Sequence, residues 1–508
     1  MRAAEEAAFA RGITAEALMD EAAAGIASSI SRVFPTPGRC IVFAGKGNNA
    51  GDVFAAAELL HARGWHIDLH LAFPEEQLGD LARKKLRATV VAGVADPGRR
   101  ETAPCGRPAG DSVPGYSPTI ILDGLLGLGA SGPLRDAIRA ACREINRLRG
   151  EQNAFVFSAD LPTGLGADSG APDADCVIAD FVITIGYAKR GLIADAALEH
   201  VGRIEVAALQ QLRRDDLPLV HGRAEARPSE IIASATALRH LLPRRAFSGY
   251  KNKFGRVGVV AGSRGLTGAA VLCAMGAMRG GAGLLRVYVL EDIYEIVATS
   301  APPEAMIQPV ESYKSLGDEP VDVWAVGPGL GHARADEILQ LIEHSPNPMV
   351  IDADGLNILS KRMDVLERAA GPRLLTPHPG EMKRLAPGGD TMSRAQSVQA
   401  FCERYPKATV LLKGSRSIIA QRGEPSSYNT TGNAGMSTGG MGDALTGVSA
   451  ALMAQQLSPY DAARLAAWLC GRAADIALFS GAVSEQSLLP RDVIEHLGRA
   501  FHELQQKD

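Results

Sequence analysis

The chain has 508 residues, too many for one ordinary domain and suited to about two or three, each able to bury a substantial core. Its composition, 46% hydrophobic and 22% charged, is that of a soluble globular protein. The formal net charge of -4 excludes a general attraction to nucleic acid or anionic membranes, so we expect small-molecule ligands held by local sites.

The cysteines and the N-terminal residues favour an intracellular protein. The seven cysteines are odd in number, widely spaced and never in a C-x-x-C pair, which predicts reduced core thiols and neither disulfides nor a zinc site. The first residues lack the apolar core of a signal peptide, and no run approaches the roughly 20 apolar residues of a membrane span. We therefore expect a cytoplasmic enzyme.

Short apolar runs alternate with longer Ala- and Leu-rich segments, a pattern typical of parallel sheets covered by helices. In the first half the expected strands are residues 40–44, 67–72, 119–122, 155–158 and 181–185. Their spacing leaves room for a crossover helix between most neighbours.

A glycine loop follows the first expected strand and precedes an Ala/Leu helix. Gly45, Gly47 and Ala50 loosely satisfy the dinucleotide fingerprint, and Asp68 lies near the place where a ribose-binding acid is sought. An NAD-dependent dehydrogenase is therefore one hypothesis for this half of the chain.

The same loop also carries many side-chain oxygens. Asn48, Asn49 and Asp52 favour a hard cation or a hydroxyl-rich ligand over a pyrophosphate. The structural alternative is a turn in which asparagine adopts left-handed geometry and Asp52 caps the following helix.

Two more loops, residues 123–129 and 158–164, follow expected strands, where open α/β sheets bind their ligands. Asp123 and Asp160 are candidates for acid/base catalysis or metal ligation, and Thr163 can add an oxygen. Lys189 either meets an anionic group or is a solvated surface lysine.

The strand and helix rhythm breaks between about residues 209 and 245, in a charged stretch that contains Pro218 and Pro228, so we place the domain boundary there. A second series of expected strands follows at residues 256–261, 284–289, 321–326, 349–352, 373–375 and 409–412. Helices are expected between them, including residues 268–278 and 461–478.

The glycine-rich residues 431–443 are the most informative stretch of the second half. With a helix expected at residues 444–453, they would place backbone N–H groups at a helix N-terminus, where an anion is favoured. Asp443 would lie beside a phosphate bound there and accept a proton from an attacking hydroxyl or water. The alternative is that Asp443 only complements the helix dipole.

Four further polar residues each allow two interpretations. His378, between two prolines, is a ligand contact or a rigid turn residue. Lys413 ends a strand and is a nucleotide contact or an exposed turn lysine. Asp352 and Asp354 bind magnesium through water or simply terminate a strand.

Read together, these motifs resemble those of the bifunctional NAD(P)H-hydrate repair enzymes. The three loops of the first half resemble, in the right order, the epimerase domain of that family. The second half resembles its ADP-dependent dehydratase domain through residues 250–255, 261–270, 327–331, 352–357, 375–381, 412–414 and 431–443. The resemblance spans nearly the whole chain.

The resemblance implies an α/β protein of two domains. Residues 1–210 would form a Rossmann-like three-layer sandwich with epimerase activity, and residues 236–508 a ribokinase-like three-layer α/β/α dehydratase domain. Residues 211–235 would be the connector.

The implied activity is repair of nicotinamide cofactors damaged by water addition. The first domain would interconvert the R and S hydrates of NADH and NADPH, and the second would dehydrate the S form at the expense of ADP, giving AMP and phosphate. The resemblance also implies potassium and magnesium ions and a homo-oligomer. The alternative is a ribokinase-like small-molecule kinase fused to a non-catalytic Rossmann-like binding module.

The resemblance carries specific roles onto this sequence, with Asp160 and Asp443 as the candidate catalytic residues. A potassium ion would be held by Asn49, Asp123 and Thr163. In the first domain the hydrate would contact Asn48, Asn49, Ala50, Gly51, Asp52, Gly127, Leu128, Gly129, Ala130, Ser131, Gly132, Pro133 and Asp160. In the second it would contact Ala269, Gly329, Gly331, His378 and Asp443, and the adenine nucleotide would contact Lys413, Gly414, Ser415, Arg416, Ser417 and Gly442.

Some positions depart from the family pattern. Ala50 and Val53 replace loop glycines, which predicts a less close approach of the first loop to its ligand. Thr163 stands where serine is common and keeps both oxygens, so we expect ion binding to survive.

Overall fold

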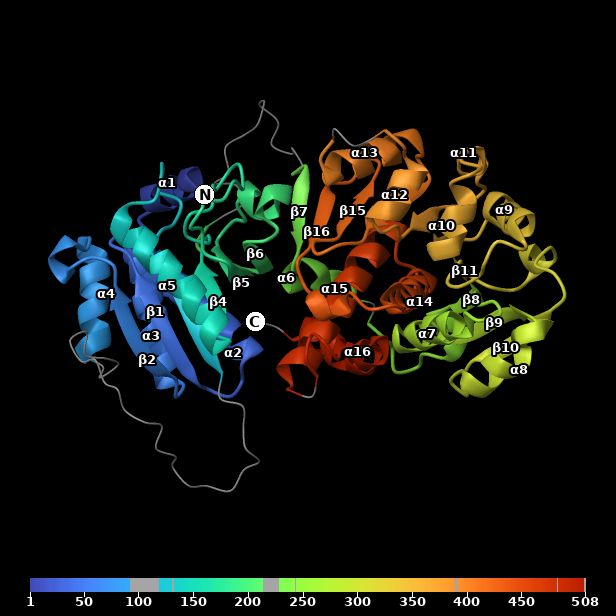
Figure 1. Ribbon diagram of the computed structural model, residues 1–508, viewed down its shortest axis with the longest axis horizontal. Coiled ribbons are helices and arrows are strands. Elements are labelled where there is room, and N and C mark those ends of the chain that lie inside the picture. Colours follow the sequence, from blue (N-terminus) through green and yellow to red (C-terminus); the bar gives the residue numbers. More distant parts are fainter. Residues whose placement is uncertain are drawn as a thin grey trace, which may run out of the picture. The chain divides into compact units, whose positions relative to one another are not determined.

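The computed structural model describes residues 1–91, 118–129, 132–212, 228–242, 244–388, 392–481 and 483–506. The chain divides into two compact units, Met1–Ala226 and Arg227–Asp508 (Figure 1). The predicted Ala130 and Ser131 lie outside the described residues, as does Cys105. Among the described helices, none has both the length and the apolar character that crossing a membrane requires.

The first unit contains a six-stranded parallel sheet in the order β2-β1-β3-β4-β5-β6. Its strands are β1 (Arg39–Ala44), β2 (His66–Leu71), β3 (Thr119–Gly124), β4 (Phe155–Ala159), β5 (Ala179–Ile185) and β6 (Val201–Ala207). Its helices are α1 (Arg2–Ala10), α2 (Ala15–Val33), α3 (Asn48–Ala62), α4 (Asp80–Val91) and α5 (Asp136–Gln152).

Helices cover both faces of this sheet, which gives the expected three-layer sandwich. In Figure 1, α5 lies in front of the strands, while α3 lies behind them and packs on α2 and α4. Strands buried on both faces need apolar residues in succession rather than in alternation. In β3, Ile120, Ile121 and Leu122 are all fully buried.

The second unit contains a ten-stranded sheet in the order β10-β9-β8-β11-β12-β13-β14-β15-β16-β7. All neighbouring strands are parallel except at β15, which is antiparallel to both β14 and β16. The strands are β7 (Glu230–Ala233), β8 (Arg256–Val260), β9 (Leu284–Leu290), β10 (Met306–Val310), β11 (Val323–Val326), β12 (Met349–Ile351), β13 (Arg373–Leu375), β14 (Ala408–Leu412), β15 (Ile418–Gln421) and β16 (Ser426–Asn429).

The helices of this unit complete an α/β/α arrangement, and α7 and α14 form one of its closest packed pairs. They are α6 (Ala235–Leu238), α7 (Thr267–Arg279), α8 (Glu291–Ser300), α9 (Ala335–His344), α10 (Ala353–Leu359), α11 (Asp364–Arg368), α12 (Pro379–Leu385), α13 (Arg394–Arg404), α14 (Met441–Ala454), α15 (Pro459–Phe479) and α16 (Pro490–Gln505). Gly276 and Gly447 allow the α7 and α14 backbones to approach, since a Cβ at either would meet the other helix's backbone.

Five strands were not expected from the sequence: β6, β7, β10, β15 and β16. They lie toward the edges of their sheets. In β6 and β16, polar residues replace the continuous apolar runs of the central strands. β16, for example, consists of Ser426, Ser427, Tyr428 and Asn429. β7 lies inside the segment assigned to the connector and pairs with β16.

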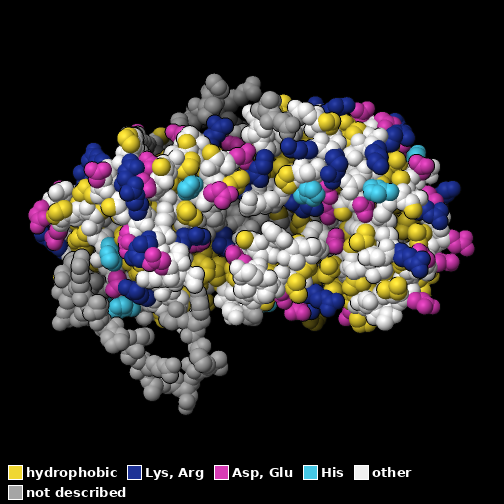
Figure 2. Space-filling view, in the orientation of Figure 1, with side chains coloured by type: hydrophobic (Ala, Val, Ile, Leu, Met, Phe, Trp, Pro, Cys, Tyr) yellow, Lys and Arg dark blue, Asp and Glu magenta, His cyan; other side chains and the backbone are white. Residues whose placement is uncertain are grey.

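Charge is mixed over the visible surface. On the face drawn in Figure 2, Lys and Arg side chains alternate with Asp and Glu side chains instead of gathering into a patch of one sign. This agrees with the small net charge and with ligands held by local sites.

Candidate functional sites

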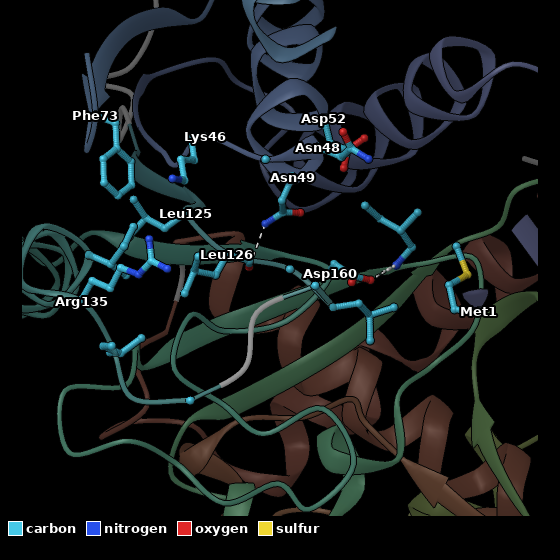
Figure 3. Close-up of a pocket in the computed structure, with 18 of the residues that line it drawn as sticks. Met1, Lys46, Asn48, Asn49, Asp52, Phe73, Leu125, Leu126, Arg135 and Asp160 are labelled. Carbon is cyan, nitrogen blue, oxygen red and sulfur yellow. Dashed lines mark hydrogen bonds between the residues drawn. The ribbon is translucent and has the colours of Figure 1, made fainter. Parts of the chain in front are cut away.

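A cavity of about 650 Å³ opens where strands of the first unit end (Figure 3). The loops after β1, β3 and β4 line it, and α1 adds Met1 and Glu5. The predicted residues at its wall are Asn48, Asn49, Asp52, Gly127, Leu128, Gly129, Gly132, Pro133 and Asp160. The structure thus brings together side chains from three loops that are far apart in sequence, at the edge where parallel sheets bind ligands.

The first turn of α3 carries the polar residues of the first loop. The helix begins at Asn48 with Gly47 as its N-cap, so Asp52 lies a full turn inside it and does not cap it. Neither Asn48 nor Asn49 has a positive φ, so the alternative of a left-handed turn is wrong. Asn48 and Asp52 are four residues apart and line the cavity from the same helical face.

Ala50 and Gly51, also predicted to contact the hydrate, are buried away from the cavity. Both are among the buried residues of α3, because helical geometry turns positions 50 and 51 from the face that carries Asn48 and Asp52. Val53 is buried too and packs beside Gly124. The substitutions at positions 50 and 53 therefore alter the packing of α3 on the sheet and not the lining of the cavity.

Asn49 ties the three loops together. Its Nδ2 donates to the carbonyl oxygens of Leu126 at 3.0 Å and Ala159 at 3.2 Å. The side chain is only 8% exposed, so its orientation is fixed by these two bonds. Asn49 is thus a bridge between the loops after β3 and β4.

Asp123 is fully buried and accepts four hydrogen bonds. The donors are Ser158 Oγ at 2.8 Å, the Thr163 backbone N–H at 3.0 Å, Thr163 Oγ1 at 2.7 Å and the Leu125 N–H at 3.2 Å. Burial raises the pKa of Asp123, and the bonds from Thr163 and Ser158 partly oppose that rise. The structure joins Asp123 and Thr163 as predicted, but with hydroxyl and amide hydrogens at the four acceptor positions of the carboxylate.

Asp160 combines strained backbone with a buried side chain. Its φ of 68° lies in the left-handed region, which costs an aspartate about 1 kcal/mol or more and is common at functional sites. The side chain is 7% exposed, and its Oδ1 accepts from the Ile185 N–H at 3.1 Å. Figure 3 shows Asp160 at the floor of the cavity.

The sequence did not reveal the environment of Lys189. It is 7% exposed and forms an ion pair with Asp160, so the alternative of a solvated surface lysine is wrong. Its Nζ also donates to Thr184 Oγ1 at 3.2 Å and to the Ile185 carbonyl at 2.9 Å, which uses all three N–H groups.

In the second unit, the glycine-rich segment leads directly into α14. Gly440 is the N-cap with a φ of 90°, and the helix starts at Met441, three residues before the expected position. Gly442 and Asp443 therefore belong to the first turn, where backbone N–H groups lack helical partners and favour an anion. Only glycine suits position 440, because its φ lies in the left-handed region and a Cβ there would overlap the Leu272 side chain.

Asp443 has the perturbed acidity of a catalytic base. Burial raises its pKa to about 7, and the nearby charges of Asp352 and Asp354 add to the rise, while Lys413 opposes it. A carboxyl group with a pKa near neutrality can accept and release a proton at working pH. A helix N-terminus alone would lower the pKa of a carboxyl group, so the rise at Asp443 comes from its burial and its acidic neighbours.

Lys413 lies in an acidic niche beside the first turn of α14. Its Nζ is 2.6 Å from Asp352 Oδ1 and 3.9 Å from Glu381 Oε2. Burial alone would lower the pKa of Lys413, but Asp352 and Glu381 hold it above the ordinary value. A Cβ at Gly442 would lie 3.1 Å from Asp352 Oδ2 and 3.2 Å from Lys413 Nζ, so glycine lets α14 approach this pair.

Asp352 is 1% exposed, and Thr446 Oγ1 donates to its second oxygen at 3.0 Å. Both oxygens of Asp352 thus bind protein groups. Lys413 is buried at its charged end and is not an exposed turn lysine. The remaining predicted nucleotide contacts continue the same loop: Gly414 and Ser415 are exposed, Ser417 is half-buried, and the Arg416 side chain is buried.

His378 is the N-cap of α12, and its Nδ1 accepts from the Gly380 N–H at 3.0 Å. The ring is half exposed, and the His378 backbone N–H donates to Glu381 Oε2 at 2.8 Å. His378 therefore has the structural role of a rigid helix cap. The ring Nε2 lies 3.5 Å from Glu381 Oε1.

The loop at residues 327–331 lies against the same acidic segment. Gly331 N–H donates to Asp354 Oδ2 at 2.9 Å. Gly329, with a φ of 57°, packs against Ala269 at the start of α7, so two of the predicted hydrate contacts lie side by side. Gly327, with a φ of 122°, leaves no room for a side chain, because a Cβ would overlap the Asp352 carbonyl oxygen.

Comparison with known proteins connects both sites to one family. The family model described as NAD(P)H-hydrate dehydratase matches residues 257–497, and the model described as YjeF-related protein N-terminus matches residues 15–191. The bifunctional NAD(P)H-hydrate repair enzyme Nnr of Moorella thermoacetica is 33% identical across 96% of this chain and 93% of its own length. The enzyme of the same name from Escherichia coli is 32% identical across 98% of this chain and 92% of its own.

Among solved structures, the ADP/ATP-dependent NAD(P)H-hydrate dehydratase from Bacillus subtilis, co-crystallised with ATP and Mg²⁺, is 27% identical to this chain. The match covers 54% of this chain and 98% of the Bacillus subtilis chain, with a TM-score of 0.47.

Proposed function

The chain belongs to the family of bifunctional NAD(P)H-hydrate repair enzymes, and from this premise we propose how its residues divide the chemistry. Its activity is the epimerisation of the R and S hydrates of NADH and NADPH, and the ADP-dependent dehydration of the S form to the reduced cofactor, AMP and phosphate. Residues 1–210 would carry the epimerase site and residues 236–508 the dehydratase site, with residues 211–235 between them.

The dehydratase assignment rests above all on Asp443 in the first turn of α14. The hydrate's hydroxyl group is a poor leaving group, and phosphorylation makes it a good one. Asp443 would accept the hydroxyl proton as the oxygen attacks the terminal phosphorus of ADP and the bond to AMP breaks. Breaking the C–O bond then releases phosphate, and loss of a ring proton restores the double bond.

The neighbouring residues would orient the two ligands. The first-turn amides at Gly442 and the ammonium group of Lys413 offer positive charge to the transferring phosphoryl group. Ser415 and Ser417 would contact the nucleotide, with Gly414 and Arg416 from the same loop. Ala269, Gly329, Gly331 and His378 would contact the S hydrate.

In the first unit, Asp160 would exchange a proton with the hydrate inside the 650 Å³ cavity. The strained φ of Asp160, its burial and its pairing with Lys189 support this role. Asn48, Asp52 and the residues between Gly127 and Pro133 that line the cavity would hold the substrate.

The proposed cofactors are ADP, magnesium and potassium. Asn49, Asp123 and Thr163 supply only oxygen ligands for potassium, which suits a hard cation. Because four hydrogens already face Asp123, the hydroxyl hydrogens of Ser158 and Thr163 would turn away when the ion binds. We further propose that the protein is cytoplasmic, because NADH and NADPH are used in the cytoplasm, and that it forms a homo-oligomer.

The experiment that tests this function uses the purified protein, ADP, Mg²⁺ and the S hydrate of NADH. We expect one AMP and one phosphate for each reduced nicotinamide recovered, followed by absorbance and chromatography. A small-molecule kinase would instead accumulate a phosphorylated product without recovery of absorbance. That outcome would overturn the proposal.

A further inference from the structure

Two carboxyl side chains reach the epimerase cavity from different elements. Asp52 comes from α3, one turn after the start of the helix, and Asp160 from the loop that follows β4. Figure 3 shows them on opposite sides of the hollow, with Asp52 above and Asp160 below. The charge of Asp160 helps to raise the pKa of Asp52. In the proposed function, Asp160 alone exchanges a proton with the hydrate.

The surroundings of the two groups differ in a way that separates their roles. Asp160 has the ammonium group of Lys189 as an ion-pair partner and a backbone N–H as a further donor. Asp52 faces a negative neighbourhood: burial raises its pKa well above the ordinary value, Asp160 and Glu5 add to the rise, and Lys189 partly opposes it. A carboxyl group with a raised pKa opposite one that is ion-paired with a lysine is the arrangement of a paired acid and base.

We propose that Asp52 is a second catalytic residue of the epimerase site, which exchanges a proton with one face of the hydrated ring while Asp160 does so at the other. Lys189 is then a positioning residue, which acts by holding Asp160 as the acceptor. This inference rests on the proposed assignment of epimerisation to this cavity.

The chemistry of the substrate calls for such a pair. Water adds to an enamine at the carbon bonded to nitrogen, so the hydroxyl group stands next to the ring nitrogen. Asp52 donates a proton to that hydroxyl, the C–O bond breaks with its electron pair leaving as water, and the nitrogen lone pair forms a C=N bond. Water then adds to the opposite face, its oxygen bonds to carbon, the C=N electrons return to nitrogen, and Asp160 takes the released proton.

Inversion of configuration explains why one carboxylate is not enough. The hydroxyl leaves from one face and returns to the other, so the donor and the acceptor must lie on opposite sides of the ring. Asp52 and Asp160 line the cavity from different elements and would stand on the two sides of a ring bound between them (Figure 3). The reverse reaction uses the same two groups with their roles exchanged. No oxidant, reductant or nucleotide is consumed in either direction.

The test follows epimerisation alone, in the full chain with Asp443→Asn so that the S hydrate is not consumed. Conversion of pure R hydrate is measured by chromatography, with the uncatalysed rate subtracted. We expect Asp52→Asn to lower kcat by roughly 100-fold or more while the KM stays within about threefold, because removal of a general acid or base costs roughly 10²–10⁴-fold. Asp52→Glu should restore part of the rate.

A pH profile separates catalysis from binding. With Asp52 as the acid, kcat for the R hydrate falls on the basic side as Asp52 loses its proton, and Asp52→Asn removes that basic limb. The other charged groups on the described cavity wall are Glu5, Lys46, Arg135 and the α-amino group of Met1. Asp136→Asn is the matched control, since Asp136 lies in the first turn of α5, is exposed and does not line the cavity.

The outcomes distinguish the inference from the function beneath it. An unchanged kcat with a raised KM in Asp52→Asn would make Asp52 a binding residue only and overturn the inference. If Asp160→Asn also kept full activity, the assignment of the cavity itself would fail. For Lys189, we expect Lys189→Gln to lower kcat more than it changes KM and Lys189→Arg to recover activity; equal loss in both would remove its positioning role.

Discussion

The substitution Asp443→Asn should abolish dehydration and, at the same time, stabilise the second unit in a pH-dependent way. The pKa of Asp443 in the folded protein is about 7, against 3.8 for the ordinary group. The difference of 3.2 corresponds to about 4 kcal/mol at about 1.36 kcal/mol per pKa unit. Partial contact with solvent reduces this figure, so we expect a measured effect of about 2–4 kcal/mol.

The sign follows from the raised pKa. Below about pH 4, Asp443 is protonated in both the folded and the unfolded chain, and it costs nothing. Between about pH 4 and 7, the unfolded chain releases the proton more readily, so the free energy of unfolding falls as the pH rises. Above about pH 7 the full penalty is present. Asparagine carries no charge and avoids it.

Urea unfolding at pH 5 and pH 8 measures this effect. Trp324 and Trp468 lie in the second unit, and Trp65→Phe removes the tryptophan of the first, so fluorescence reports the second unit alone. The gain in stability from Asp443→Asn should grow by about 2–3 kcal/mol between these pH values. Asp336→Asn, an exposed first-turn aspartate of α9, is the control. The same gain at both pH values would refute the reasoning.

Three further predictions concern other contacts. Lys189→Met should destabilise the first unit by about 3–5 kcal/mol in urea unfolding, because it leaves Asp160 buried without its ion-pair partner. Adding Asp160→Asn should recover part of the lost stability. A purely additive loss in the double variant would contradict the pairing. Gly327→Ala should lose dehydration and cost more than about 2 kcal/mol, because its Cβ overlaps a backbone carbonyl. Gly388 also has a positive φ, of 94°, but no atom lies near its Cβ position, so Gly388→Ala should cost less. Potassium should accelerate epimerisation relative to choline, and Asp123→Asn should remove that difference; equal rates in the two salts would exclude the ion.

Much of the central sheet of each unit could be predicted, because strands buried on both faces show as continuous apolar runs. β3 and β8 are examples, and each lies within two residues of its expected end. β16 was not expected because its four residues are mostly polar, although all of them are buried in the sheet. The start of α14 was placed three residues late, because glycines hide a helical turn from propensity alone.

At the sites, sequence motifs identified which loops carry chemistry but not how their side chains point. Ala50 and Gly51 belong to the motif, yet α3 turns them into the core. Lys189 showed no periodicity or neighbour that signals burial, because its partner Asp160 is 29 residues away. Likewise, the pair of Asp352 and Lys413 joins residues 61 positions apart, and only the folded sheet brings them together.

The most direct test of the central claim gives pure R and pure S hydrate to the variants Asp160→Ala and Asp443→Asn. With ADP present, Asp160→Ala should dehydrate the S hydrate at the wild-type rate but convert the R hydrate no faster than buffer. Asp443→Asn should epimerise without dehydrating, and a mixture of the two variants should convert the R hydrate completely. Wild-type conversion of the R hydrate by Asp160→Ala, or retained dehydration in Asp443→Asn, would contradict two separate sites with these two residues at their centres.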